Sequence, residues 1–172
     1  MFDLWLRLLS QVPGSVLWLR EYAPGSNAAL LEWAEKSGID TRRLVLAERQ
    51  PLDAHLARHA LADLFLDTQP YGAHATAADA LWAGLPVLTQ IGEVFAGRVG
   101  ASLLTAAGLP ELITRTPEEY EATALALARD PVRLKHLREK LAANRASAPL
   151  FDMTAFARGL EAAYEAMLKE KT

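Results

Sequence analysis

The distribution of apolar and polar residues predicts that helices and buried strands follow one another along the first half of the chain. Leu4, Trp5, Leu8 and Leu9 recur every three or four positions, which predicts a helix over residues 2–11. Short apolar runs further on predict strands that are covered on both faces. The predicted strands are 16–19, 44–46, 64–66 and 87–89, and the helices between them are 27–37, 52–60 and 76–83.

Residues at the ends of these helices have the chemistry of caps. Asn27 is expected to cap helix 27–37, and Gly38 to end it, because glycine tolerates the positive φ angle found there. In the same way, Thr76 is expected at the start of helix 76–83 and Gly84 at its end.

The last third of the chain has a different, almost wholly helical pattern. Helices are predicted over residues 117–129, 131–145 and 153–169. Alternating strands and helices joined by short loops are typical of a parallel sheet with helices on both faces. The sequence therefore predicts an α/β fold, with a Rossmann-like, doubly wound parallel sheet and trailing C-terminal helices. Because no repeat or linker divides the chain, we expect residues 1–172 to form a single domain.

Composition excludes several classes of protein. The 18 Lys and Arg residues are spread along the chain and the net charge is −3, which argues against a nucleic-acid surface. The absence of cysteine excludes disulfides and thiolate zinc sites. No apolar run approaches the roughly 20 residues that a membrane span needs, and Met1 is not followed by a signal-peptide pattern. We therefore expect a cytoplasmic protein that does not enter the membrane.

Residues 67–89 are the strongest candidate site, because ligands of open parallel sheets bind beyond the carboxyl ends of the strands. Small residues in this loop would let a ligand approach the backbone, and the helix that follows offers free amides to a phosphate. Thr76 could donate its hydroxyl to a phosphate oxygen, and Asp79 could accept hydrogen bonds from sugar hydroxyls. The alternative is an ordinary loop and helix start, in which Thr76 is only a cap.

Two further segments follow predicted strands. In residues 47–60, His55 and Arg58 share a helix face and could stack on a flat base, or lie on an ordinary exposed helix. His55 and His59 have the spacing of metal ligands, but no third ligand is nearby, so no metal is expected. In residues 89–104, Arg98 could touch a ligand or form an ion pair, and the glycines could allow close helix packing.

Taken together, these segments resemble the C-terminal catalytic lobe of the O-linked N-acetylglucosamine transferases. That family includes the plant SPINDLY-type proteins and bacterial proteins with TPR repeats. Residues 74–86 are similar to the family's His-Thr-Thr-x-x-Asp-x-Leu-Trp-x-Gly-x-Pro run, and residues 92–99 to its next loop. Residues 12–19, 61–68 and 149–151 are also similar, so the resemblance is collinear over most of the chain.

The resemblance implies a GT-B architecture, in which the donor lies between two Rossmann-like lobes. It implies inverting, metal-independent transfer of N-acetylglucosamine from UDP-GlcNAc to Ser or Thr hydroxyls of a protein acceptor, with no cofactor besides the donor. SPINDLY-type members use GDP-fucose instead. The residues that the resemblance places at the nucleotide are Gln50, His55, Arg58, His74, Ala75, Thr76 and Asp79. By this resemblance uracil is contacted by the Gln50 backbone, His55 and Arg58. The diphosphate is held by His74, Ala75 and Thr76, and the ribose by Asp79. His74 and Thr76 would stabilise the diphosphate as it leaves.

This chain departs from the family's pattern in ways that leave other functions open. Ala75 replaces the second motif residue, and Leu52 stands where the family has a lysine. The chain resembles the family only after the strand and lysine loop that open its lobe, so we interpret it as a fragment without the N-terminal lobe and TPRs that contact the acceptor. An edge exposed by the missing strand could be covered by a homodimer. A non-catalytic interaction module is the second hypothesis, and another GT-B enzyme, such as a sugar-nucleotide epimerase, is the third.

Overall fold

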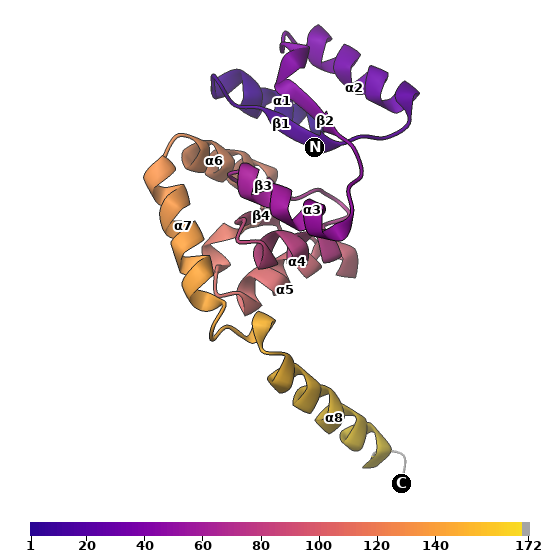
Figure 1. Ribbon diagram of the computed structural model, residues 1–172, viewed down its shortest axis with the longest axis vertical. Helices are drawn as coiled ribbons and strands as arrows, with labels where there is room; N and C mark the ends of the chain where they lie inside the picture. The colour runs from indigo at the N-terminus through magenta and orange to yellow at the C-terminus, as the bar shows by residue number, and fades with distance from the viewer. Residues whose placement is uncertain (170–172) are drawn as a thin grey trace.

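The computed structural model describes residues 1–169, which contain eight α-helices and five short strands. In chain order these are α1 (Phe2–Gln11), β1 (Leu17–Arg20), α2 (Pro24–Lys36), β2 (Leu44–Ala47), α3 (Leu52–Arg58), β3 (Phe65–Leu66), α4 (Ala75–Trp82), β4 (Val87–Gln90), α5 (Val99–Ala106), β5 (Ile113–Thr114), α6 (Pro117–Ala128), α7 (Pro131–Asn144) and α8 (Met153–Lys169). Figure 1 shows the first four elements grouped at one end of the molecule and α8 projecting at the other.

All strand pairs are parallel, and helices cover the sheets, which confirms the predicted α/β class. The strands are divided between two sheets, however: β1 pairs with β2, and β3, β4 and β5 form a second sheet in that order. The predicted Rossmann-like parallel fold is confirmed, but the sequence did not indicate that β3 would follow β2 along the chain without pairing with it.

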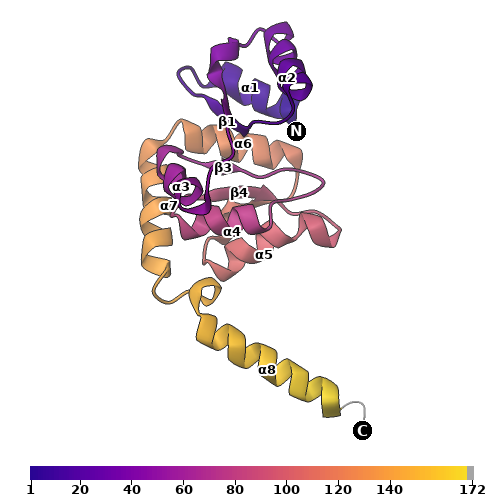
Figure 2. The same cartoon turned by 45° about the vertical axis from the view of Figure 1, so that its right-hand side comes forward.

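Helix α1 joins the two parts of the fold because its apolar residues enter two cores. Leu4 and Leu8 belong to the large core that contains β4, α5 and α6, whereas Leu6 and Leu9 pack in a smaller core with α2 and β2. The Arg7 side chain also forms an ion pair with Glu121 of α6, at 2.6 Å. Figure 2 shows α6 running directly beneath the β1–β2 unit. Residues predicted as one amphipathic face thus contribute to two separate cores.

Several boundaries differ from the predictions. Helix α2 begins at Pro24, so Asn27 is not its cap; the Asn27 side chain is buried and accepts a hydrogen bond from the Tyr22 amide at 2.9 Å. Strand β5, which has two residues, was not predicted, because so short a segment leaves no periodic pattern. Gly38 and Gly84 do have positive φ angles, 75° and 85°, as predicted for helix ends.

Helix α8 extends away from the rest of the fold in both views (Figures 1 and 2), and its described residues are exposed. Its large apolar side chains recur at helical spacing along one stripe: Met153, Phe156, Leu160, Tyr164 and Met167. Within residues 1–169, no helix is long and apolar enough to cross a membrane.

The turn between α1 and β1 is held by Arg43, which lies just before β2. Its guanidinium donates hydrogen bonds to the carbonyls of Ser15 at 2.8 Å, Leu9 at 2.8 Å and Val12 at 2.9 Å. These carbonyls lie in the last turn of α1 or just after it, where the regular donors of a helix are missing. One side chain therefore ties the C-terminal end of α1 to the second strand.

Replacing Arg43 by methionine should lower the free energy of unfolding by about 2 kcal/mol, because charged hydrogen bonds to partly buried carbonyls are lost. Urea denaturation followed by circular dichroism measures the change. The matched control is Arg42→Met, which removes an exposed arginine that pairs with its near neighbour Asp40. The control should leave the unfolding midpoint almost unchanged; equal effects of the two substitutions would contradict the role given to Arg43.

Candidate functional site

The loop between β3 and α4 is anchored by the carboxylate of Asp67, which is 1% exposed. Its Oδ1 accepts hydrogen bonds from the amides of Thr68 at 2.7 Å and Ala73 at 2.6 Å. Its Oδ2 accepts one from the Thr89 hydroxyl of β4, at 2.6 Å. Both ends of the loop are thus held to one buried anion. The sequence analysis included Asp67 in the candidate segment 67–89 but gave its side chain no role.

Residues after β4 pack against the loop through glycines. The Gly72 amide donates to the Ala96 carbonyl at 2.9 Å, and the Cα of Gly92 would lie 3.1 Å from a Cβ atom at Gly97. A Cβ at Gly100 would lie 2.7 Å from Asp67 Oδ2. Close packing, which was one alternative for the glycines of this segment, is found at Gly97 and Gly100. Arg98 is exposed, and the ion pair that was one alternative for it does not form within residues 1–169.

Helix α4 begins at Ala75, with His74 as its N-cap, so the prediction that Thr76 caps this helix is wrong. The first amides of a helix have no acceptor within it, and those of Ala75, Thr76 and Ala77 occupy this position. Together with the positive end of the helix dipole, they make a favourable environment for an anion. Ala75 and Thr76 are exposed, and both residues line a pocket in front of the helix.

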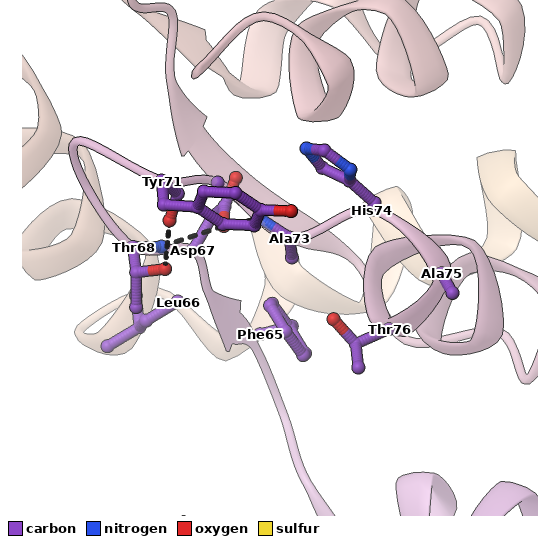
Figure 3. A pocket seen from close by; sticks show the side chains of 10 residues that line it. Phe65, Leu66, Asp67, Thr68, Tyr71, Ala73, His74, Ala75 and Thr76 are labelled. Atoms are coloured by element: carbon purple, nitrogen blue, oxygen red, sulfur yellow. Dashed lines mark hydrogen bonds between the residues drawn. The ribbon is translucent and has the colours of Figure 1, made fainter. Parts of the chain in front are cut away.

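The His74 ring forms one wall of the pocket in front of this helix. Its Nε2 lies 3.2 Å from the Ala96 carbonyl, which can only accept, so Nε2 carries a hydrogen. The ring stacks on Tyr71 with centroids 5.0 Å apart, and the Phe95 ring meets it edge-on at 5.9 Å. Figure 3 shows Tyr71 and His74 on one side of the pocket, with Phe65 and Thr76 across from them. The two aromatic neighbours of His74 were not predicted, although both stand in the candidate loops.

Helix α3 brings two more predicted residues to α4. His55 Nε2 lies 3.9 Å from Asp79 Oδ2, and Arg58 Nη2 lies 2.7 Å from His55 Nδ1. The structure therefore groups His55, Arg58 and Asp79, and Asp79 lies on the helix that His74 caps. Gln50 is exposed in the loop just before α3. The roles of all these residues remain predictions.

The electrostatic environment of His55 favours its neutral form. Burial lowers the pKa of its imidazole below the ordinary value, and the positive charges of Arg58 and His59 lower it further, whereas Asp79 opposes the shift. The second histidine of the pair, His59, is buried, and its Nδ1 lies 2.8 Å from the His55 carbonyl. Within residues 1–169, no three His, Cys, Asp or Glu side chains are grouped so that they could hold a metal ion.

The fold and this site define an α/β domain of parallel strands with a pocket at a helix start and a His–Arg–Asp group beside it. Residues 1–160 match glycosyl transferase family 41, so the chain belongs to that family. It is 35% identical over 159 residues to the UDP-N-acetylglucosamine–peptide N-acetylglucosaminyltransferase of Caenorhabditis elegans, which covers 92% of this chain and 14% of that protein.

Two other relatives agree with this assignment. A probable UDP-N-acetylglucosamine–peptide N-acetylglucosaminyltransferase SPINDLY of Hordeum vulgare is 36% identical, over 96% of this chain and 18% of its own. A solved structure of a mutant Thermobaculum terrenum O-GlcNAc transferase has a TM-score of 0.92 and 38% identity, over 98% of this chain and 33% of that one. The chain thus spans about a fifth or less of the curated relatives and a third of the solved chain.

Substituting Gly100 by alanine should destabilise the fold by about 1–3 kcal/mol, because the new methyl group would overlap Asp67 Oδ2 and Thr89 Oγ1. Differential scanning calorimetry or urea denaturation measures the loss. Gly25→Ala is the control, since Gly25 also lies in a helix but a Cβ atom there would have no neighbour within 4 Å. A Gly100→Ala protein as stable as the control would show that the Asp67 anchor tolerates displacement.

Proposed function

We propose that this chain is the nucleotide-sugar-binding lobe of an inverting, metal-independent protein O-GlcNAc transferase that uses UDP-GlcNAc. Family membership supports a glycosyltransferase, and the named activities of the relatives support this donor and a protein acceptor. The acceptor contacts and the TPR repeats would be contributed by parts of the protein outside this lobe. The location proposed for the enzyme is the cytoplasm.

One observation carries the proposal: the three groups of residues predicted to bind a nucleotide diphosphate are contiguous. His74, Ala75 and Thr76 lie at the start of α4, and Asp79 lies one turn further along the same helix. Asp79 also approaches His55 of α3 to within 3.9 Å. A nucleoside diphosphate could therefore extend from a base at α3, past a ribose at Asp79, to phosphates at the α4 amides.

In the proposed reaction, the oxygen of a Ser or Thr hydroxyl attacks the anomeric carbon from the face opposite the diphosphate. The bond from that carbon to the phosphate oxygen breaks, UDP leaves with the electron pair, and the hydroxyl proton passes to a base outside this lobe. Negative charge grows on the leaving diphosphate. Fixed amide donors and a helix dipole at the start of α4 would stabilise that charge without reorganising during the reaction.

The isolated chain should bind UDP weakly and transfer no sugar. Isothermal titration calorimetry at pH 7.5 should give a dissociation constant in the range of about 0.1–1 mM for UDP, because the donor contacts lie on this lobe while the acceptor contacts do not. GDP serves as the comparison, and tighter binding of GDP would favour a SPINDLY-like donor. A requirement for Mg²⁺ in UDP binding would contradict the proposal that the enzyme is metal-independent. The absence of binding heat from folded protein at millimolar UDP would contradict the proposed nucleotide-binding function.

Replacing Asp79 by asparagine should weaken UDP binding about tenfold, because hydrogen bonds from ribose hydroxyls to a carboxylate are stronger than those to an amide. The control is Asp53→Asn, in which an exposed acid of the first turn of α3 loses its charge. Calorimetry should give the control a dissociation constant for UDP within about twofold of the unmodified chain's, because surface substitutions change free energies by only roughly 0.5 kcal/mol. Equal losses in the two variants would mean that net charge, rather than a ribose contact, sets the affinity.

A further inference from the structure

The contact between Arg58 and His55 fixes the tautomer of the histidine. A guanidinium has only donors, so at 2.7 Å the Arg58 Nη2 must donate and His55 Nδ1 must accept. In the neutral ring the hydrogen therefore lies on Nε2, the nitrogen that faces Asp79 Oδ2 at 3.9 Å. Both edges of the imidazole are directed at protein groups.

The same contact restricts Arg58. Its second terminal nitrogen, Nη1, donates to the Glu48 carbonyl at 2.9 Å, in the loop that follows β2. Two acceptors on different segments thus hold the planar guanidinium, whose long side chain would otherwise sample many rotamers. Three of its five N–H groups remain for a ligand.

We propose that His55 is a positioning residue: its unprotonated Nδ1 holds the Arg58 guanidinium in the orientation that meets the base of the nucleotide. Nucleotide affinity then depends on His55 staying neutral. This inference rests on the proposed function, because it concerns how the same nucleotide site is ordered.

The groups around His55 determine what protonation would do. Arg58 of α3 and the neighbouring His59 oppose a positive charge on His55, whereas Asp79 of α4 favours it. A proton on Nδ1 removes the only lone pair that Arg58 can use and places two cations in contact, so Arg58 must move away. Burial, Arg58 and His59 lower the pKa of His55 below its ordinary 6.5. The ring is therefore neutral at pH 7, and the contact with Arg58 is lost only as the pH falls through that lowered pKa.

The first test needs no ligand. Nitrogen-15 NMR of the histidine rings should show His55 with its hydrogen on Nε2, and Arg58→Met should raise the pKa of His55, since it removes a cation and the donor to Nδ1. A hydrogen on Nδ1, or an unchanged pKa in Arg58→Met, would overturn the proposal.

The second test follows UDP binding by calorimetry from pH 7.5 down to about one pH unit below the His55 pKa that the NMR titration gives. At pH 7.5, His55→Ala should bind about tenfold more weakly, and His55→Gln should be intermediate, because its amide oxygen can still accept from Arg58. Relative to His55→Gln, the unmodified chain should lose at least about threefold in affinity as the pH falls. Taking this ratio cancels protonation of UDP itself. His136→Gln, on the exposed face of α7, should keep the affinity and pH profile of the unmodified chain.

The outcomes separate the two proposals. Two results would overturn the positioning role and leave the proposed function intact, provided that the unmodified chain binds UDP at pH 7.5. One is an affinity ratio of the unmodified chain to His55→Gln that does not change over the pH range. The other is His55→Gln binding UDP as weakly as His55→Ala. Failure of the folded, unmodified chain to bind UDP at pH 7.5 would overturn the proposed function, and the nucleotide half of this inference with it.

Discussion

A single buried carboxylate constrains the site. Leaving Asp67 unpaired inside the fold would be costly, since a buried charge needs hydrogen-bond partners. Its partners come from both ends of the loop and from β4, and the Tyr120 hydroxyl of α6 donates to the Asp67 carbonyl at 2.9 Å. Burial raises the pKa of Tyr120, so its hydroxyl stays a donor. These hydrogen bonds hold both ends of the loop and thereby position the start of α4.

The rest of the site depends on where that helix begins. Because α4 starts at Ala75, its first two residues line the pocket, and Asp79 lies on the side that approaches α3. Helix α3 in turn lies in the connection between the β1–β2 sheet and the second sheet. Contacts of α1 with both cores and with α6 maintain the position of one sheet relative to the other. The proposed base and phosphate positions therefore lie on the helices that precede and follow β3.

The departures from the family's pattern lie at helix starts. Leu52 and Ala75 are the first residues of α3 and α4, and both are exposed. In each case the side chain is apolar where the resemblance implies a polar one, while the backbone amide remains. A site that relies on amides and the helix dipole would retain part of its attraction for a diphosphate after such changes, since those groups do not depend on side-chain identity.

The sequence alone determined most helices and strands, because apolar periodicity and residues such as Gly38 and Gly84 act over a few neighbouring positions. It also singled out His55, Arg58 and Asp79. Tertiary structure decided that the strands divide into two sheets, that α4 starts before Thr76, and that Asp67 is a buried anchor. It also decided that His55 meets Asp79. These features depend on contacts between residues far apart in the chain, which local propensity does not record.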